Sequence, residues 1–345
     1  MTDSATPPAG RPVTMRDVAE RAGVSKSLVS LVLRGAPHVS PTRRQLVLDT
    51  MTELGYRPNR LAQTLATSRS NTVGVLLNDL RNPWFVELLE GLGTALHSTG
   101  LAPVLADSRT DLRVGRRSVE TLLAQGVDAL VVVGTTSDSA AIAAAAESIP
   151  VVLAGTLEPR LPYVDIAVND DESGARQATD HLISLGHQRI AHMRGPGTVG
   201  ELRLTGYCAA MIGAGLDPDA YAEDGGMSEE SGYAAARRLL ARPDRPTAIF
   251  AFNDIAAIGT MSAAADQNLT IPQELSIVGY DNTYLAKIRH ISLTSVDNGN
   301  FAVGVQAGRF LNERLDAPNL PARMHSVPTQ LFIRGTTGRF SPLAR

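Results

Sequence analysis

Residues Val13–Leu65 read VTMRDVAERAGVSKSLVSLVLRGAPHVSPTRRQLVLDTMTELGYRPNRLAQTL, and this stretch decides the fold of the first part of the chain. Thr14 and Asp17 have the spacing of a capping box, which predicts a helix from near Met15 to about Ala22. Gly23 permits the tight turn that follows. The chain therefore opens with a short, well-delimited helix.

Two more short helices are predicted within this stretch. Ser25 can cap the second helix, and Gly35 with Pro37 ends it. Its apolar positions are Leu28, Val29, Val32 and Leu33. The pair Ser40–Pro41 is typical of a helix start, and Gly55 follows the end of this third helix. At helical spacing, the side chains expected to be buried there are Leu46, Val47, Met51 and Leu54.

The first two helices, joined by the turn Ala22–Ser25, have the arrangement of a helix-turn-helix. In that motif the second helix lies in the major groove of DNA, with its N-terminal residues toward the base edges. Lys26 can donate to guanine, and Leu28 can contact a thymine methyl group. The expected base contacts are Lys26, Ser27, Leu28 and Leu31, and the expected phosphate contacts are Ser25 and Ser30. The alternative is a three-helix bundle with a purely structural role.

A fourth helical segment is predicted after Pro58, where Asn59 can cap a helix from Arg60 onward. Isolated helices shorter than about 12–15 residues are marginal in water, so this one needs a partner. Two copies from a dimer could enter the minor groove, where apolar side chains wedge between base steps. Leu65 is the candidate wedge, and the alternative is an ordinary linker leucine.

The charge of the chain is unevenly distributed. Residues 1–70 contain ten arginines and lysines against five aspartates and glutamates, a net charge of +5. The total is −3, so the remainder carries −8. A basic first part on an acidic body indicates that the first part alone meets a polyanion. A chance fluctuation in surface charge is the alternative.

The composition indicates a globular protein with more than one core. Its 345 residues predict two or three domains, and 43% hydrophobic with 19% charged residues is ordinary for that class. No apolar run reaches the roughly 18 residues of a membrane span, so no membrane partner is expected. Residues 1–12 lack the apolar region of a signal peptide and are predicted to form a disordered tail. The single cysteine, Cys208, supports neither a disulfide framework nor a cysteine metal site, and fits a reducing cytoplasm.

From Asn71 the pattern changes to short apolar runs alternating with helices. The runs expected to be buried parallel strands are 72–77, 102–106, 129–133, 151–154, 189–193, 247–251 and 275–279. Helices are expected at 85–98, 118–125, 140–147 and 174–185. This alternation predicts a doubly wound α/β body. About 270 residues is large for one sheet, so two lobes with a cleft between them are expected.

Polar and aromatic residues follow several of these strands. Ligands of such folds bind at the carboxyl ends of strands, where carboxylates, amides and arginine can bind vicinal hydroxyls and an aromatic face can stack on a sugar or base. The candidates are Asn78, Asp79, Asn82, Trp84, Phe85, Asp107, Arg203, Asn253, Asp254 and Asp281. For any one of them, a solvated loop position is the alternative.

Residues 13–340 resemble a transcriptional repressor of the lac repressor (LacI/GalR) family. The first part is similar to the family pattern D-V-A-x-x-A-G-V-S, V-S and L-G-Y-x-P-N-x-x-A-x-x-L, at 17–19, 22–25, 29–30 and 54–65. Two positions depart from it. Leu28 stands where threonine or alanine is usual, and Leu31 where arginine or asparagine is frequent. The resemblance adds Thr14, Tyr56, Asn59 and Ala62 to the expected DNA contacts.

The resemblance also implies a division of the chain. It implies a helix-turn-helix domain at 13–58, a hinge helix and linker at 59–70, and a ligand-sensing and dimerisation core at 71–345. The core would consist of two lobes of the periplasmic-binding-protein type. One would span about 71–168 with 299–327, and the other about 169–298 with 328–345.

The family's effector site is expected to map onto Trp84, Phe85, Arg203, Asn253 and Asp281, with Asn82 and Asp107 beside them. Met227 falls where relatives often have an aromatic residue, and Asn298 where glutamine is frequent. A sugar or polyol is favoured by the carboxylate-rich set, and a purine comes second. Whether the ligand releases or tightens DNA binding stays open.

Catalysis is not expected from this sequence. It contains no G-x-x-x-x-G-K-[ST], H-E-x-x-H or G-x-S-x-G, and Gly91-Leu-Gly93 lacks the third glycine of a dinucleotide fingerprint. The seven histidines show no metal-ligand spacing, so no cofactor or metal is expected. An enzyme would need a phosphate loop or a catalytic pair. A solute-binding protein for transport would need a signal peptide and no basic first part.

The leading hypothesis is therefore a cytoplasmic, ligand-controlled repressor. A homodimer is expected to read a near-palindromic operator, because a two-fold protein requires a two-fold site. Some relatives form tetramers through a C-terminal leucine heptad. A tetramer is not expected here, because the chain ends at 340–345 without such a repeat.

Overall fold

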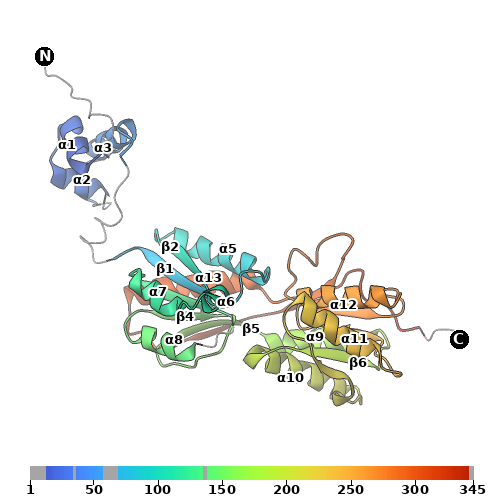
Figure 1. Ribbon diagram of the computed structural model, residues 1–345. Helices are drawn as coiled ribbons and strands as arrows, with labels where there is room; N and C mark the ends of the chain where they lie inside the picture. Colours follow the sequence, from blue (N-terminus) through green and yellow to red (C-terminus); the bar gives the residue numbers. More distant parts are fainter. Residues whose placement is uncertain (1–12, 34–35, 57–68, 135–137, 342–345) are drawn as a thin grey trace. The chain divides into compact units, whose positions relative to one another are not determined.

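The structure is a computed structural model that describes residues 13–33, 36–56, 69–134 and 138–341. The chain divides into two compact units, with the boundary between Ser70 and Asn71 (Figure 1). We call the first unit the head and the second the body.

The described part of the head contains the helices α1 (Met15–Ala22), α2 (Lys26–Leu33) and α3 (Pro41–Glu53). The predicted capping box is confirmed, because the Thr14 hydroxyl accepts from the Asp17 amide and the Asp17 carboxylate accepts from the Thr14 amide. Gly23 and Gly55 have φ angles of 64° and 62°, so both turns use the left-handed region that favours glycine. Val18, Val29 and Val47 are fully buried at the centre of the head.

The prediction that Leu46 is buried in the head is wrong. Leu46 is 46% exposed, while Val47, Thr50 and Met51 are the buried residues of α3. Residues at i, i+3 and i+4 share one face of a helix, and Val47 defines that face here. Leu46 comes one position earlier and turns away from the core.

The body contains two lobes, each built on a six-stranded sheet within the described residues. The first sheet has the order β11-β5-β4-β3-β1-β2, and all of its pairs are parallel. Its strands are β1 (Thr72–Leu77), β2 (Ala102–Asp107), β3 (Ala129–Val133), β4 (Val151–Ala154), β5 (Asp165–Asn169) and β11 (Met324–Val327). We call this half of the body the first lobe.

The second sheet has the order β12-β10-β9-β8-β6-β7, and only its pair β10–β12 is antiparallel. Its strands are β6 (Ile190–Arg194), β7 (Ala222–Asp224), β8 (Ala248–Phe250), β9 (Ser276–Tyr280), β10 (Thr294–Asp297) and β12 (Gln330–Phe332). We call this half the second lobe. The chain passes from one lobe to the other after β5, after β10 and after β11.

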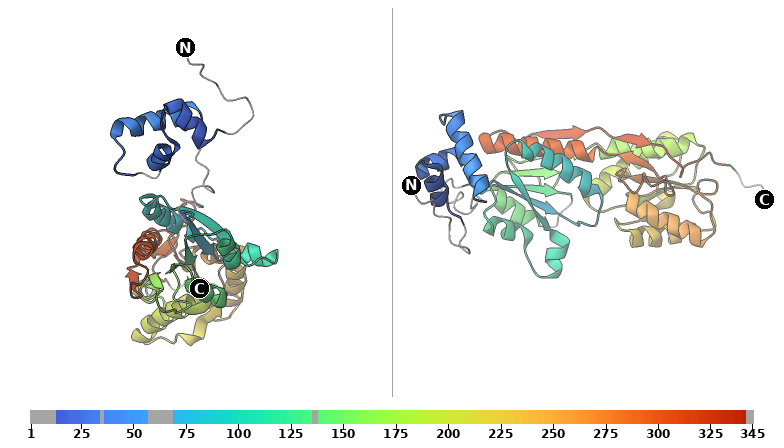
Figure 2. Two further views of the ribbon diagram at one scale, coloured as in Figure 1. Left: turned by 90° about the vertical axis from the view of Figure 1, so that its left-hand side faces the viewer. Right: turned by 90° about the horizontal axis from the view of Figure 1, so that it is seen from above.

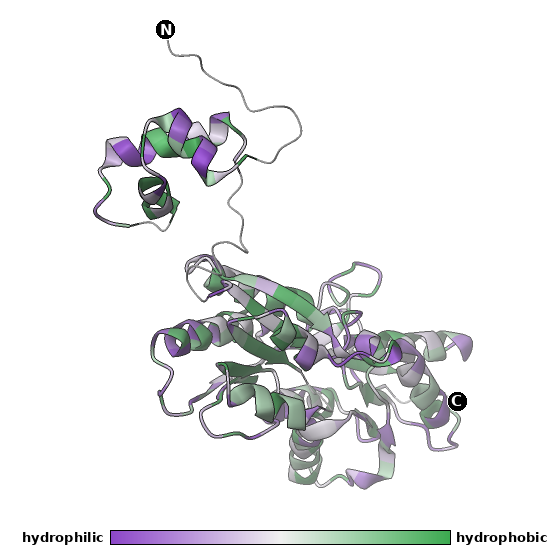
Figure 3. Cartoon of the chain, turned by 60° about the vertical axis from the view of Figure 1, so that its left-hand side comes forward, coloured by the Kyte–Doolittle hydropathy of each residue, from purple (hydrophilic) through white to green (hydrophobic). Residues whose placement is uncertain are grey.

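Helices cover both faces of each sheet (Figures 1 and 2). The first lobe carries α5 (Trp84–His97), α6 (Ser108–Arg113), α7 (Ser118–Ala124), α8 (Ser139–Ala146) and α13 (Asn300–Asp316). The second carries α9 (Asp171–Ser184), α10 (Gly197–Gly213), the 3-10 turn η1 (Asp219–Tyr221), α11 (Glu229–Leu240) and α12 (Asp254–Asp266). Separate apolar clusters fill the two faces of each sheet, and the central strands are largely hydrophobic (Figure 3). The predicted doubly wound fold is thus confirmed.

Some strands differ from the prediction. The strand at 102–106 was expected to be buried, but β2 alternates between half-buried and exposed residues because it lies at the edge of its sheet. The strands β5, β7, β10, β11 and β12 were not predicted, since short strands such as Met324–Val327 contain no continuous apolar run. No helix in the described ranges is long and apolar enough to cross a membrane.

Gly91 and Gly304 allow α5 and α13 to pack closely. Helix α5 lies directly against α13, and a Cβ added to Gly91 would collide with the backbone carbonyl of Phe301. A Cβ on Gly304 would meet the carbonyl of Leu88 in the same contact. These positions bring the two backbones together, which is a structural reason for glycine here.

Candidate functional site

The start of α2 presents the predicted base-contacting residues of the head. Ser25, Lys26 and Ser27 are exposed. The Ser25 hydroxyl accepts a hydrogen bond of 3.2 Å from the Leu28 amide, so Ser25 caps the helix, as Thr14 does for α1. Polar side chains at the N-terminal end of this second helix are therefore open to solvent, as a major-groove helix requires.

Other predicted DNA contacts are less accessible. Leu28 and Leu31 are half-buried, and both pack partly against the head core. Ser30 and Tyr56 are half-buried as well, and burial raises the pKa of the Tyr56 hydroxyl. The two leucines that depart from the family pattern thus also serve packing. Asn59, Ala62 and Leu65 lie outside the described residues.

In the body, a cavity of about 60 Å³ lies between the two lobes. We call it the inner space. Seven of the nine predicted effector residues line it, namely Asn82, Trp84, Phe85, Arg203, Met227, Asn253 and Asp281. Trp84 and Phe85 come from the start of α5 in the first lobe, with ring centroids 5.0 Å apart at 77°. A Cβ on Gly155 would collide with the Trp84 ring, so this glycine makes room for the indole.

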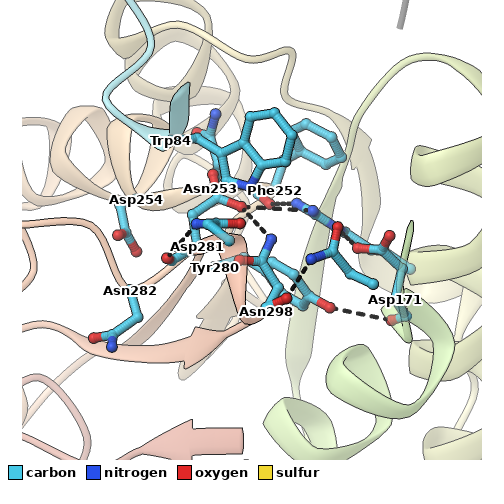
Figure 4. Close-up of polar contacts among 12 residues, drawn as sticks. Trp84, Asp171, Phe252, Asn253, Asp254, Tyr280, Asp281, Asn282 and Asn298 are labelled. Atoms are coloured by element: carbon cyan, nitrogen blue, oxygen red, sulfur yellow. Dashed lines mark hydrogen bonds and ion pairs between the residues drawn. The ribbon is translucent and has the colours of Figure 1, made fainter. Parts of the chain in front are cut away.

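Arg203 belongs to a buried charged network in the second lobe, and its partners Asp171 and Asp281 are labelled in Figure 4. Its Nε donates to Asp171 Oδ1 at 2.8 Å, and its Nη1 donates to the carbonyl oxygen of Phe252 at 2.6 Å. Its Nη2 lies 3.6 Å from Asp281 Oδ1. The guanidinium also lies 3.7 Å from the Tyr280 ring centroid. The side chain is 5% exposed, so protein groups already hold the arginine that was predicted to contact a ligand.

The two carboxylates beside Arg203 are in an environment that opposes ionisation. Burial raises the pKa of Asp281 well above its usual value, and the positive charge of Arg203 opposes that effect. Burial also raises the pKa of Asp171, again against the charge and hydrogen bond of Arg203. Asp281 has a φ of 98°, an unusual backbone conformation for aspartate. Asp281 thus combines an unusual backbone conformation with a carboxyl group whose ionisation is opposed by burial.

Asn253 connects the inner space to the start of α12. Its Oδ1 accepts from the Ala256 amide at 2.8 Å, which caps the helix. Its Nδ2 donates to the carbonyl oxygen of Met227 at 3.1 Å, which fixes the loop that carries Met227. Met227 itself is 37% exposed toward the cleft.

Two predicted effector residues do not line the inner space. Asp107 caps α6, with its Oδ1 accepting from the Thr110 amide at 3.1 Å and its Oδ2 from the Leu80 amide at 3.3 Å. Asn298 is fully buried, and its Nδ2 donates to Asp281 Oδ1 at 3.1 Å. In this structure Asn298 therefore positions a cleft carboxylate instead of facing the cavity.

A second and larger space, of about 830 Å³, adjoins the first. We call it the outer space. Residues of both lobes line it, including Asp79 and Arg109 from the first and Arg194 and Asp224 from the second. The cleft between the lobes therefore has a narrow inner end and a wide outer end.

Comparison with known proteins accounts for this combination of head and cleft. The model described as "Bacterial regulatory proteins, lacI family" matches residues 14–59. The model described as "Periplasmic binding proteins and sugar binding domain of LacI family" matches residues 70–322, well over half of the chain.

The chain belongs to the lacI family.

Individual relatives match this chain along nearly its whole length. The ribose operon repressor of Escherichia coli K12 is 34% identical over 328 residues, which cover 94% of this chain and 99% of that protein. A solved structure of the lac repressor dimer bound to operator and the anti-inducer ONPF is 30% identical with a TM-score of 0.81, covering 95% and 100%. The complex of the regulator CelR with cellobiose is 30% identical with a TM-score of 0.71, covering 94% and 100%.

As a lacI-family protein, the chain is a DNA-binding transcriptional regulator with an effector site between the lobes. Sequence reasoning missed several residues of the cleft, namely Asn169, Asp171, Val199 and Phe252. Asp171 is the first residue of α9, whereas the predicted helix began at Gly174. An aspartate near the start of a helix usually acts as a cap. The local sequence therefore does not indicate that Asp171 pairs with Arg203, 32 residues away.

One buried carboxylate behind the lacI-family cleft predicts a pH dependence of stability. Asp254 is fully buried, and its Oδ2 accepts from the Thr283 amide at 2.7 Å while its Oδ1 accepts from the Ser295 hydroxyl at 2.6 Å. Burial raises its pKa from 3.8 to about 6, despite these hydrogen bonds. The folded state therefore holds this proton more tightly than the unfolded chain does. Its contribution to stability falls as pH rises through this window, by about 3 kcal/mol in all.

We expect Asp254→Asn to remove this dependence. Urea unfolding of both proteins between about pH 4 and pH 7 should show the variant gaining on the wild type by up to about 3 kcal/mol as pH rises. The control is Asp266→Asn, which makes the same chemical change at the exposed last residue of the same helix. A constant difference between wild type and Asp254→Asn at all pH values would contradict the prediction.

Proposed function

We propose that this chain is a cytoplasmic, homodimeric transcriptional repressor that reads a near-palindromic operator and responds to a sugar or polyol. The observation that carries the proposal is the combination of an exposed Lys26–Ser27 pair at the start of a capped second helix with an aromatic and polar cleft between two lobes. A ligand in that cleft contacts both lobes, so it favours one placement of the lobes over another. The protein acts by binding alone, without catalysing a reaction.

Two similarities support the details of this proposal. The relatives include a ribose operon repressor and a regulator solved with cellobiose, which favours a sugar effector. The lac repressor structure is a dimer on its operator, which favours a two-fold complex. The DNA-contact set Thr14, Ser25, Lys26, Ser27, Leu28, Ser30, Leu31, Tyr56, Asn59, Ala62 and Leu65 is proposed on the same basis.

The proposal is tested with the full-length chain and DNA selected by binding from a random duplex library. The selected sites should be near-palindromic, and at least one compound from a panel of sugars, polyols and nucleobases should change their affinity. Selected sites without two-fold symmetry would contradict the homodimer. Operator binding that no compound changes would contradict effector control.

We expect Lys26→Ala to weaken binding to the selected operator by about 10- to 100-fold, the equivalent of about 1–3 kcal/mol for a lost base contact. Fluorescence anisotropy at one fixed salt concentration measures it, since phosphate contacts vary with salt. Arg176→Ala removes an exposed cation from the body and should leave the affinity unchanged. If Lys26→Ala weakens selected and random DNA equally, Lys26 contacts phosphate and the base-contact assignment is wrong.

A further inference from the structure

The inner and outer spaces of the cleft are continuous. Asn78, Asn82, Pro196 and Met227 line both of them, so these residues form the boundary where one space opens into the other. Trp84 lines only the inner space, so a ligand that contacts Trp84 and also fills the outer space must extend across this boundary.

The volumes of the two spaces differ by more than tenfold. The inner space of about 60 Å³ lies far below the roughly 300–1,000 Å³ that ligand pockets occupy. The outer space of about 830 Å³ lies near the upper end of the roughly 300–1,000 Å³ that ligand pockets occupy. The inner space is too small for a whole effector, so part of a well-fitting effector must lie in the outer space, which has room for more than one sugar unit.

The outer space is wide although the lobes already touch elsewhere. The Thr198 hydroxyl of the second lobe donates to Glu158 Oε1 of the first at 2.7 Å. Lys287 Nζ of the second lobe lies 3.2 Å from Glu87 Oε1 of the first. In addition, the Asn169 side-chain amide donates to the carbonyl oxygen of Asn298. The outer space is therefore wide even though the two lobes are in contact elsewhere.

Each arginine that lines the outer space already has an acidic partner. Asp79 Oδ2 lies 2.7 Å from Arg81 and 2.6 Å from Arg109 in the first lobe. Across the cleft, Arg194 lies 2.9 Å from Asp224. Glu229 and Glu230 add further negative charge at the same wall. Because its cations are neutralised and its acids are in excess, this surface disfavours an anion such as a sugar phosphate. Guanidinium and carboxylate groups can still donate to and accept from neutral hydroxyls.

From these observations we infer that the effector is a neutral oligosaccharide of at least two sugar units. One ring faces Trp84 at the inner end, which widens to admit it. The next unit lies in the outer space between the Asp79–Arg109 pair and the Arg194–Asp224 pair. The inference rests on the proposed effector-controlled function and adds the size and charge of the ligand.

Isothermal titration calorimetry of the full chain tests the inference. The probes are cellobiose, maltose, lactose and trehalose, their components glucose and galactose, the anion glucose 6-phosphate, and adenine. At least one disaccharide should bind about tenfold or more tightly than its component monosaccharides, and glucose 6-phosphate should bind no better than glucose. A monosaccharide or adenine that binds as tightly as the best disaccharide overturns the inference, as does a lack of binding by every disaccharide.

A variant in the outer space locates the second unit. Arg194→Ala should weaken the best disaccharide roughly tenfold, as expected for a lost hydrogen bond from a charged group, and leave its component monosaccharide within about twofold. Arg117→Ala is the matched control, because it also breaks an arginine–carboxylate pair, with Glu120, but lies away from both spaces. If Arg194→Ala does not fold, Asp224→Ala removes the other, 83% exposed member of the pair. Equal weakening of disaccharide and monosaccharide would place the second unit elsewhere and overturn the assignment.

The selected operator separates this inference from the proposed function. If a monosaccharide or adenine changes operator affinity and no disaccharide does, effector control stands and the oligosaccharide inference fails. If a disaccharide binds the body and operator affinity stays the same, the size class stands and the proposed control fails.

Discussion

Asp165→Asn is expected to lower the free energy of unfolding of the body by about 3–5 kcal/mol, the typical cost of leaving a buried charge without its partner. Asp165 is fully buried, and its two carboxylate oxygens accept from Arg314 at 3.0 and 2.8 Å. Arg323 adds a contact of 2.9 Å. Arg314 is 2% exposed, so it cannot reach water when the carboxylate is neutral. This ion triad joins β5 to α13 and to the segment that enters β11.

The effect of Asp165→Asn should depend on pH in a defined direction. Burial by itself raises the pKa of Asp165, but the hydrogen bonds from Arg323 and Arg314 outweigh it and hold the pKa below 3.8. A carboxyl with a lowered pKa in the folded state contributes stability above its unfolded pKa and loses it as pH falls through the folded pKa. The difference between wild type and variant should therefore be full at neutral pH and shrink in acid below about pH 4.

Urea unfolding followed by fluorescence measures this prediction, since Trp84 is the single tryptophan and lies in the same lobe. Glu313→Gln is the matched control, because Glu313 also pairs with Arg323 but its side chain is 47% exposed. Exposed ion pairs contribute about 0–1 kcal/mol, so this variant should be close to wild type. Equal losses for the two variants would mean that burial of Asp165 does not decide its contribution.

The ion triad also illustrates what the sequence could and could not predict. The apolar runs at 72–77, 129–133 and 151–154 were recognised at their observed bounds, because a strand buried on both faces has a continuous hydrophobic sequence. Asp165 begins β5, a strand that was missed, because Asp-Ile-Ala-Val-Asn has polar residues at both ends. Its partners follow it by about 150 residues, and no local pattern indicates a contact over that separation.

The cleft was predicted in part for a similar reason. Residues that follow strands, such as Trp84 and Asn253, were recognised because parallel strands present their carboxyl ends at one edge. Asp107 also follows a strand, yet its side chain is used as a helix cap. Asn298 has the right position along the chain but lies behind Asp281. Position after a strand thus predicts which edge a residue occupies, while neighbouring hydrogen bonds decide whether it faces the cavity.

Arg203 connects several of the segments that line the cleft. Its guanidinium holds α10 to α9 through Asp171, to the end of β8 through Phe252 and to the end of β9 through Asp281. These are the segments of the second lobe that line the inner space. A change at Arg203 therefore alters both the stability of the second lobe and the shape of the ligand site.

We expect Arg203→Met to lower the free energy of unfolding by about 3–5 kcal/mol near pH 8, because it leaves two buried carboxylates without their cation. Arg203 opposes the burial that raises the pKa of Asp171 and Asp281, so removing it raises both values further. Acids with a raised folded pKa bind protons more tightly when folded, so the variant should gain stability relative to wild type as pH falls. Urea unfolding followed by circular dichroism should thus show a smaller loss near pH 5 than near pH 8.

Two comparisons show that charge, and not lost volume, causes this effect. Arg203→Lys keeps a cation but cannot contact Asp171, Phe252 and Asp281 at the same time. Its loss of unfolding free energy should therefore be intermediate and nearly independent of pH. Arg203→Met should also abolish effector binding, since the loops carrying Phe252 and Asp281 lose their common partner. A loss from Arg203→Met that is equal near pH 5 and pH 8 would mean that a packing defect dominates, because a cavity does not titrate.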